Sequence, residues 1–143
     1  VWVSAEEWRT ARTSNVAFPV RKMLQAVRWK PIEFEHGQVT QRLGQPAVDV
    51  KGDGSIWYLS TPGHTPGSAS ILVHGNQAAW LFIGDIAWVD DHLEDRHRPG
   101  WVSLLVDGRP KQHKHALQWA RSLAQQCPSL NVVAGHEIKW AMP

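Results

Sequence analysis

The sequence predicts a layered α/β (α+β) domain. Three observations carry this prediction: a helix-capping signal near the N-terminus, a central run of short strands separated by turn sequences, and an amphipathic helical stretch followed by a last strand. At 143 residues, with 43% hydrophobic and 20% charged residues, the chain has the size and composition of a single globular domain. We therefore expect one hydrophobic core.

The N-terminal third is predicted to hold two short strands and two helices. The first three residues are strand-like, and Ser4 with Glu7 three residues later has the spacing of a capping box, which predicts a helix to about Arg12. Apolar residues then recur at helical spacing over residues 18–30, until a proline ends this second helix. Residues 32–34 form a short strand candidate, and the stretch that follows has only a weak pattern.

The rest of the chain is predicted to form five strands and one helix. Apolar residues on both sides of a Gly-Asp-Gly turn indicate a hairpin, and a second turn signal separates two more strands. The helix carries small and apolar residues on one face, including Ala116 and Ala120. The expected strands cover residues 48–50, 56–59, 70–73, 79–83 and 132–134, and the helix covers residues 112–126.

Composition and charge narrow the function classes. The net charge is only +2, and the basic residues are scattered, so we expect no nucleic-acid partner. No apolar run is long enough to span a membrane, and no signal sequence opens the chain, which favours a soluble, cytoplasmic protein. The single cysteine, Cys127, provides neither an internal disulfide nor a structural zinc site and is expected to be a small buried residue.

Three side chains that can bind metals follow predicted strands, each directly after a glycine. His64 lies in a Thr-Pro-Gly-His-Thr-Pro-Gly loop, whose two Pro-Gly pairs enforce a tight turn. Asp85 follows the apolar strand that ends at Gly84, and His136 follows a buried-type strand and Gly135. Imidazole nitrogens and a carboxylate suit zinc, manganese or iron, and a carboxylate has two oxygens with which to bridge two ions.

Each of these residues also has a simpler interpretation. A single histidine in a loop is usually a surface residue without a role, and an aspartate after a strand usually caps the next turn. The repetition of the pattern favours a shared site over three separate coincidences. An unrelated small α/β domain with chance Gly-His and Gly-Asp turns stays open as an alternative.

The ordered motifs P-G-H-T-P-G, G-D and G-H resemble the last three metal-binding motifs of the metallo-β-lactamase-fold superfamily. The G-D-G-S turn at residues 52–55 is similar to the lactonase-like branch of that superfamily. The resemblance implies half of an αββα sandwich, with a mixed and mostly antiparallel sheet and flanking helices. It also implies two metal ions, zinc first among the candidates, with His64 on the first ion, Asp85 bridging both and His136 on the second. Ser68 stands where other members of the superfamily carry a second histidine.

One motif of the superfamily is missing from this sequence. The resemblance places an H-x-H-x-D-H motif before the P-G-H loop, whereas the only H-x-H here is His113-Lys114-His115, late in the chain and on the predicted helix. We expect these two histidines to be solvated and their replacement to have little effect. Residues 1–143 are therefore expected to be the C-terminal half of the domain, with an incomplete metal shell.

The resemblance implies metal-dependent hydrolysis of an ester or lactone by a metal-activated hydroxide. The fragment alone is expected to be inactive, and to need either the N-terminal half or self-association. The alternative is a catalytically silent half-domain that acts as an oligomerising or binding module, so the sequence leaves open whether the chain is an enzyme.

Tryptophan is abundant, with nine residues. Trp57, Trp80 and Trp119 are expected in the core. Trp88 and Trp101 flank an irregular stretch after Asp85 and belong either to the core or to a pocket wall. The two histidines of that stretch, His92 and His97, are expected to be exposed.

Overall fold

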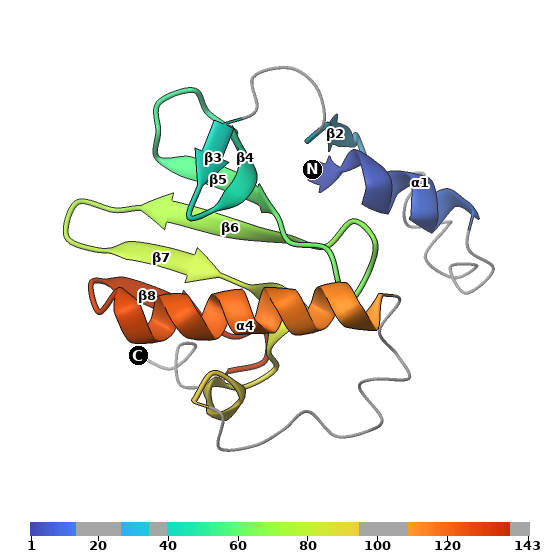
Figure 1. Cartoon of the computed structure of the whole chain (residues 1–143). Helices are drawn as coiled ribbons and strands as arrows, with labels where there is room; N and C mark the ends of the chain where they lie inside the picture. The colour runs from blue at the N-terminus through green and yellow to red at the C-terminus, as the bar shows by residue number, and fades with distance from the viewer. Residues whose placement is uncertain (14–26, 35–39, 95–108, 138–143) are drawn as a thin grey trace.

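The structure is a computed structural model that describes residues 1–13, 27–34, 40–94 and 109–137. A six-stranded sheet forms its centre, a long helix lies against one face of the sheet, and a smaller unit of two strands and one helix lies near one end (Figure 1). This arrangement confirms the predicted α/β class and the mostly antiparallel sheet with flanking helices. The predicted helix over residues 18–30 falls largely outside the described residues, as do Trp101 and His97.

The N-terminal unit contains strand β1 (Trp2–Ser4), helix α1 (Ala5–Thr13) and strand β2 (Lys30–Ile32). The two strands pair in parallel, which requires a long connection between them. The predicted N-cap is confirmed, because the Ser4 hydroxyl accepts a hydrogen bond of 3.0 Å from the Glu7 backbone N–H. The predicted strand at residues 32–34 in fact begins two residues earlier and ends at Ile32.

The six strands of the main sheet lie in the order of the sequence, β3-β4-β5-β6-β7-β8. All neighbours are antiparallel except β7 and β8, which run parallel. Helix α4 lies between these two strands in the sequence, as a parallel crossover requires, and covers one face of the sheet. The bounds are β3 (Thr40–Arg42), β4 (Gln45–Asp49), β5 (Ile56–Ser60), β6 (Ala69–His74), β7 (Ala79–Phe82), α4 (Pro110–Gln126) and β8 (Leu130–Val133).

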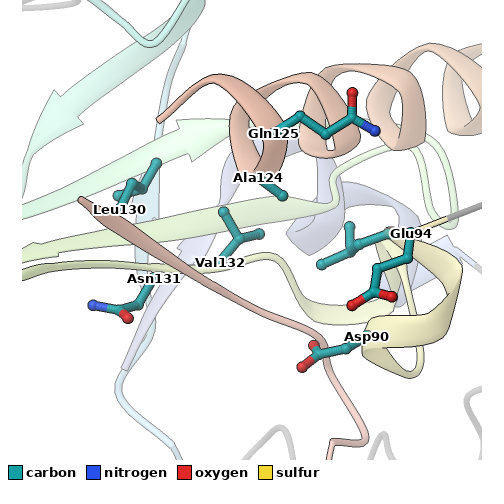
Figure 2. A pocket seen from close by; sticks show the side chains of 8 residues that line it. Asp90, Glu94, Ala124, Gln125, Leu130, Asn131 and Val132 are labelled. Carbon is teal, nitrogen blue, oxygen red and sulfur yellow. The ribbon is translucent and has the colours of Figure 1, made fainter. Parts of the chain in front are cut away.

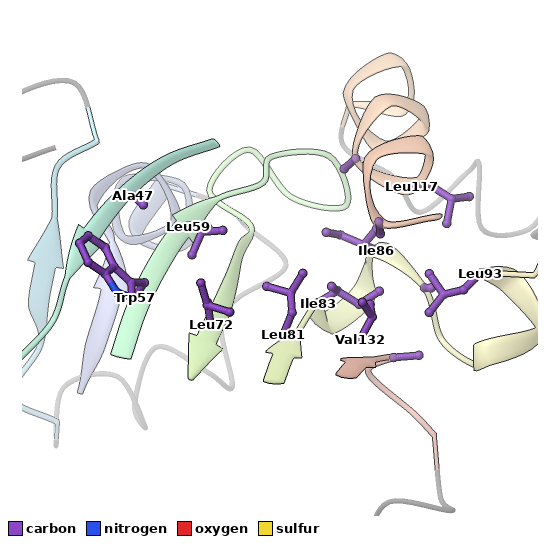
Figure 3. Packing of buried hydrophobic residues seen from close by; sticks show 14 residues of the cluster. Ala47, Trp57, Leu59, Leu72, Leu81, Ile83, Ile86, Leu93, Leu117 and Val132 are labelled. Atoms are coloured by element: carbon purple, nitrogen blue, oxygen red, sulfur yellow. The ribbon is translucent and has the colours of Figure 1, made fainter. Parts of the chain in front are cut away.

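The core lies between α4 and the sheet. Alternate residues of the strands point to this side (Figure 3). Leu59 and Leu81 are fully buried there, and α4 covers them with small residues, including Ala116 and Ala120. The close fit of small helix residues over larger strand residues is what a dense core requires.

The structure corrects three further details of the sequence prediction. Strand β3 was missed, because its residues are all exposed and show no apolar alternation. Trp80 is half-buried on the sheet face opposite the core, since its neighbour Leu81 occupies the core side, whereas Trp57 is buried and Trp119 packs against the core as expected. Cys127 is only partly buried.

Two short 3-10 turns follow β7. The first, η2 (Gly84–Ile86), carries Asp85, and the second, η3 (Asp90–His92), carries a half-buried His92. Among the residues that the structure describes, no helix is both long and apolar enough to cross a membrane.

Candidate metal centre

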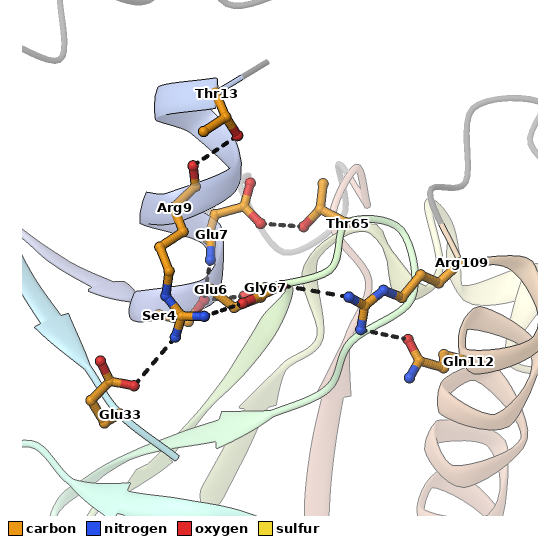
Figure 4. Close-up of polar contacts among 10 residues, drawn as sticks. All are labelled: Ser4, Glu6, Glu7, Arg9, Thr13, Glu33, Thr65, Gly67, Arg109 and Gln112. Atoms are coloured by element: carbon orange, nitrogen blue, oxygen red, sulfur yellow. Dashed lines mark hydrogen bonds and ion pairs between the residues drawn. The ribbon is translucent and has the colours of Figure 1, made fainter. Parts of the chain in front are cut away.

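The loop that carries His64 is held on one side by helix α1. The Ser4 hydroxyl donates a hydrogen bond of 2.6 Å to the Gly67 carbonyl, and the Thr65 hydroxyl donates one of 2.5 Å to the Glu7 carboxylate (Figure 4). A Cβ atom on Gly67 would collide with the backbone nitrogen of Glu7. The second glycine of the P-G-H-T-P-G motif therefore permits the helix to dock by its backbone.

Helix α4 holds the same loop on the other side. The Arg109 backbone N–H donates a hydrogen bond of 3.0 Å to the Gly63 carbonyl, just before the helix begins. A Cβ atom on Gly63 would lie 2.5 Å from the Cα atom of His113. Both glycines of the motif are thus docking points for helices, and His64 lies between them.

A second pair of glycines brings Asp85 and His136 together. Gly84 has a φ of +52°, which favours glycine, and a Cβ atom on Gly135 would lie 2.7 Å from the Gly84 carbonyl oxygen. The segment after β8 continues along the segment after η2, with a hydrogen bond of 2.8 Å from the His136 backbone N–H to the Trp88 carbonyl. The glycines that precede the two candidate ligands are therefore packed against each other.

The three predicted site residues meet around the Asp85 carboxylate. The Nε2 atom of His136 lies 3.0 Å from Oδ1 of Asp85, and the Nε2 atom of His64 lies 3.7 Å from Oδ2. The side chains are 22% exposed for His64, 44% for Asp85 and 65% for His136, so the cluster opens to solvent. Residues 72 positions apart in the sequence thus share one site, with one histidine on each carboxylate oxygen.

The cluster offers two imidazoles and one carboxylate as donors. Within the described ranges, no group of three or more His, Cys, Asp or Glu side chains is placed to hold a metal ion. His136 is hydrogen-bonded to Oδ1 of Asp85, and His64 lies near Oδ2, so each of two ions would have one carboxylate oxygen and one imidazole available. The donor set suits zinc, and each ion would need further ligands from other residues.

His113 is a residue of this region that the sequence prediction misjudged. It was expected to be solvated, but its side chain is buried, with 7% exposure, whereas His115 is exposed as predicted. Its ring lies edge-on to that of His64, with 6.5 Å between the centroids. Helical spacing would have predicted this burial, because His113 lies three and seven positions before the core residues Ala116 and Ala120 and so shares their helix face.

Trp88 belongs to the surroundings of the site and not to the core. Its side chain is exposed, and its ring centroid lies 5.9 Å from that of His136. Of the two interpretations left open by the sequence, the core position is therefore wrong for Trp88.

A separate cavity of about 420 Å³ lies at the other end of α4. Figure 2 shows the Asp90 and Glu94 carboxylates on one side and Gln125 of the helix on another. Neither histidine of the cluster nor Asp85 lines this cavity. The candidate metal centre is thus an open surface cluster, distinct from this cavity. The full lining is Asp90, Leu93, Glu94, Ala124, Gln125, Leu130, Asn131 and Val132.

Comparison with known sequences finds relatives among lactonases. No protein family profile matches the chain. The N-acyl homoserine lactonase AttM of Rhizobium radiobacter is 36% identical over 90 residues, which cover 62% of this chain and 32% of the lactonase, and its counterpart from Rhizobium johnstonii is 33% identical over the same length. The matched region therefore spans about a third of the length of these curated relatives.

Comparison with solved structures identifies the fold. A variant of AiiA from B. thuringiensis, with N-decanoyl-L-homoserine bound at its active site, has a TM-score of 0.69 at 18% identity, covering 99% of this chain and 48% of AiiA. AidC, a dizinc quorum-quenching lactonase in complex with its product, has a TM-score of 0.61 at 14% identity, covering 95% of this chain and 47% of AidC. The hydrolase AbOPH, of the β-lactamase superfamily, has a TM-score of 0.56 at 18% identity, covering 96% of this chain and 47% of AbOPH.

Proposed function

We propose that this chain, which has part of the metallo-β-lactamase fold, is the C-terminal half of a dinuclear metallohydrolase domain that opens lactones. His64, Asp85 and His136 would hold the ions, with one imidazole available to each ion and the Asp85 carboxylate shared between them. The observation that carries this proposal is the meeting of three strand-end motifs around one carboxylate, with a different histidine on each oxygen. The similarity to N-acyl homoserine lactonases supports lactones as the substrate class and zinc as the metal.

The chemistry follows from the residues and from the groups they would hold. Divalent ions held by these residues would supply a water of lowered pKa and a Lewis acid for a carbonyl oxygen, which is the chemistry that hydrolysis at neutral pH needs. The chain's own contribution is positional: the paired glycines hold Asp85 and His136, and the two docked helices hold His64. Placing the backbones of the three residues before the ions bind reduces the reorganisation that binding requires.

The remaining ligands have to come from elsewhere, because His64, Asp85 and His136 offer each ion at most two protein ligands. A catalytic zinc normally has three protein ligands and a water. We propose that a segment carrying the H-x-H-x-D-H motif completes the shell. Without it, the chain is expected to bind metal weakly and to lack hydrolytic activity. The alternative is a catalytically silent half-domain that acts as an oligomerising or binding module.

The test combines this chain with an N-terminal segment that carries H-x-H-x-D-H, taken from a lactonase relative, in the presence of zinc. Lactone opening releases a proton and is followed with a pH indicator. We expect hydrolysis only from the combination. Asp85→Ala is expected to lower the rate by more than about a hundredfold, since loss of an outer partner of a ligand already costs 10- to 100-fold. His64→Ala and His136→Ala each remove a ligand from one ion, so we expect smaller losses.

The control for these substitutions is His115→Ala, because His115 lies on the exposed side of α4. It is expected to retain the parent rate. Normal hydrolysis by the Asp85→Ala protein would show that the ligand assignment is wrong. Two ions held tightly by each isolated chain would equally contradict the half-site proposal.

A further inference from the structure

We infer that His113 is a positioning residue that ties the His64 loop to the Asp85 turn through helix α4. This inference rests on the proposed metal-binding role of His64 and Asp85. His113 itself is not proposed as a metal ligand. It lies in the first turns of α4, in the part of the helix that docks on the site loop.

The polar contact of His113 is made to the Asp85 turn. Its Nε2 atom lies 3.0 Å from the carbonyl oxygen of Ile86, the residue that directly follows Asp85. A carbonyl only accepts hydrogen bonds, so this contact requires the proton on Nε2. Ile86 is itself buried, and the bond therefore forms in a region shielded from water, where it is strong and where its loss is costly.

The backbone contact of His113 is made to the other loop. A Cβ atom on Gly63 would lie 2.5 Å from the His113 Cα atom, and the preceding Arg109 N–H binds the Gly63 carbonyl. The same helical turn therefore touches the residue before His64 with its backbone and the residue after Asp85 with its side chain. The His113 ring also lies edge-on to the His64 ring.

The position of His113 in the core strengthens the inference. The neighbouring buried positions of α4 hold alanine and leucine, and an apolar side chain would fill the same space without the cost of burying an imidazole. The hydrogen bond to the Ile86 carbonyl oxygen explains why a histidine occupies this position. The 3.7 Å separation between His64 Nε2 and Asp85 Oδ2 depends on two loops that are 21 residues apart, and His113 is in contact with both.

The test compares His113→Leu, which keeps an apolar core residue but removes the donor, with His113→Gln, whose amide can donate to the Ile86 carbonyl. The matched control is His115→Leu on the exposed side of the same helix. Thermal unfolding establishes that each variant of the chain folds. Co2+ is the metal probe, and its binding is followed by the absorption spectrum of the bound ion.

We expect His113→Leu to weaken Co2+ binding about tenfold, the usual size of an effect transmitted through a ligand's neighbour, and His113→Gln to recover most of the loss. Equal binding by the folded His113→Leu and parent chains would overturn the inference. So would His113→Gln binding as poorly as His113→Leu, because the hydrogen bond would then not be the cause. A loss as complete as that in His64→Ala would make His113 a ligand and would overturn the positioning role.

A second measurement needs no metal. In the metal-free chain, side-chain NMR of the His64 ring is expected to give one sharp signal for the parent and for His113→Gln, and a broadened or split signal for His113→Leu. An unchanged sharp signal in His113→Leu would refute the positioning role. Failure of the proposed metal function is seen separately, as Co2+ binding that does not depend on Asp85, and the NMR comparison then decides the role of His113.

Discussion

Backbone contact at glycines holds the site residues together. Gly63 and Gly67 admit the helices that flank His64, and Gly84 and Gly135 pack against each other beside Asp85 and His136. A Cβ atom at Gly63, Gly67 or Gly135 would overlap backbone atoms of the neighbouring segment. Backbone atoms cannot move aside as the end of a flexible side chain can. The placement of the three candidate ligands therefore depends on residues with no side chain.

Gly63→Ala is expected to lower the free energy of unfolding by about 1–3 kcal/mol, the usual cost of overpacking, because the new methyl group would lie 2.5 Å from His113 Cα. Urea denaturation measures this loss. The control is Gly75→Ala in the β6–β7 turn, where the nearest atom is the Ala78 carbonyl oxygen at 3.2 Å, so the loss should be smaller. A Gly63→Ala protein as stable as the parent would show that α4 does not dock as described.

At the scale of elements, strand β5 is covered on the side opposite α4 by the segment that follows β2. Tyr58 of β5 stacks on Phe34, with 6.0 Å between ring centroids and 7° between planes. Burial, and then the negative charge of Glu7, raise the pKa of Tyr58 above its usual value of 10.0. The N-terminal unit thus affects the chemistry of a strand in the main sheet.

The raised pKa predicts a loss of stability in alkali. The unfolded chain ionises Tyr58 near pH 10, whereas the folded chain resists ionisation, so this contribution is complete below pH 10 and is lost as the pH rises through the folded pKa. Tyr58 is the only tyrosine, and the ultraviolet absorbance of tyrosinate therefore reports it directly. We expect a midpoint above 10 and a smaller alkaline loss in Tyr58→Phe. A midpoint at or below 10 would show that Tyr58 is not shielded.

At the scale of the whole molecule, the two faces of the main sheet differ. Helix α4 covers one face, whereas the other carries apolar residues that are exposed or only half-buried in the described structure. Ile71 and Phe82 are paired across β6 and β7, and Phe82 is 44% exposed. Apolar patches on a sheet face favour association with another surface.

We expect the isolated chain to self-associate through this face in a concentration-dependent manner, as measured by light scattering, and to bind a hydrophobic dye. Phe82→Lys is expected to reduce both effects, because it places a charge in the middle of the patch. The matched control is Gln118→Lys on the exposed side of α4, which adds the same charge elsewhere. A compact monomer that binds no dye at all would indicate a self-sufficient small domain instead.

The sequence by itself determined the fold class, most of the strands and the identity of the three clustered residues. The alternation of apolar and polar residues along β5 to β7 and the capping pair at Ser4 each involve only a few neighbouring residues, so both are detectable in the sequence. The glycine that precedes each of His64, Asp85 and His136 is likewise a local feature of the sequence. The assignment of these three residues as metal ligands stays a prediction.

Only the tertiary structure decided which residues meet, because contacts across the fold leave little trace in local pattern. Strand β3 has no apolar alternation and exists through its pairing with β4. The burial of His113 depends on where α4 crosses the Asp85 turn, and its hydrogen bond to the Ile86 carbonyl exists only in the folded arrangement of these two segments. Local periodicity is a short-range property, whereas the meeting of His64, Asp85 and His136 depends on backbone packing between segments distant in the sequence.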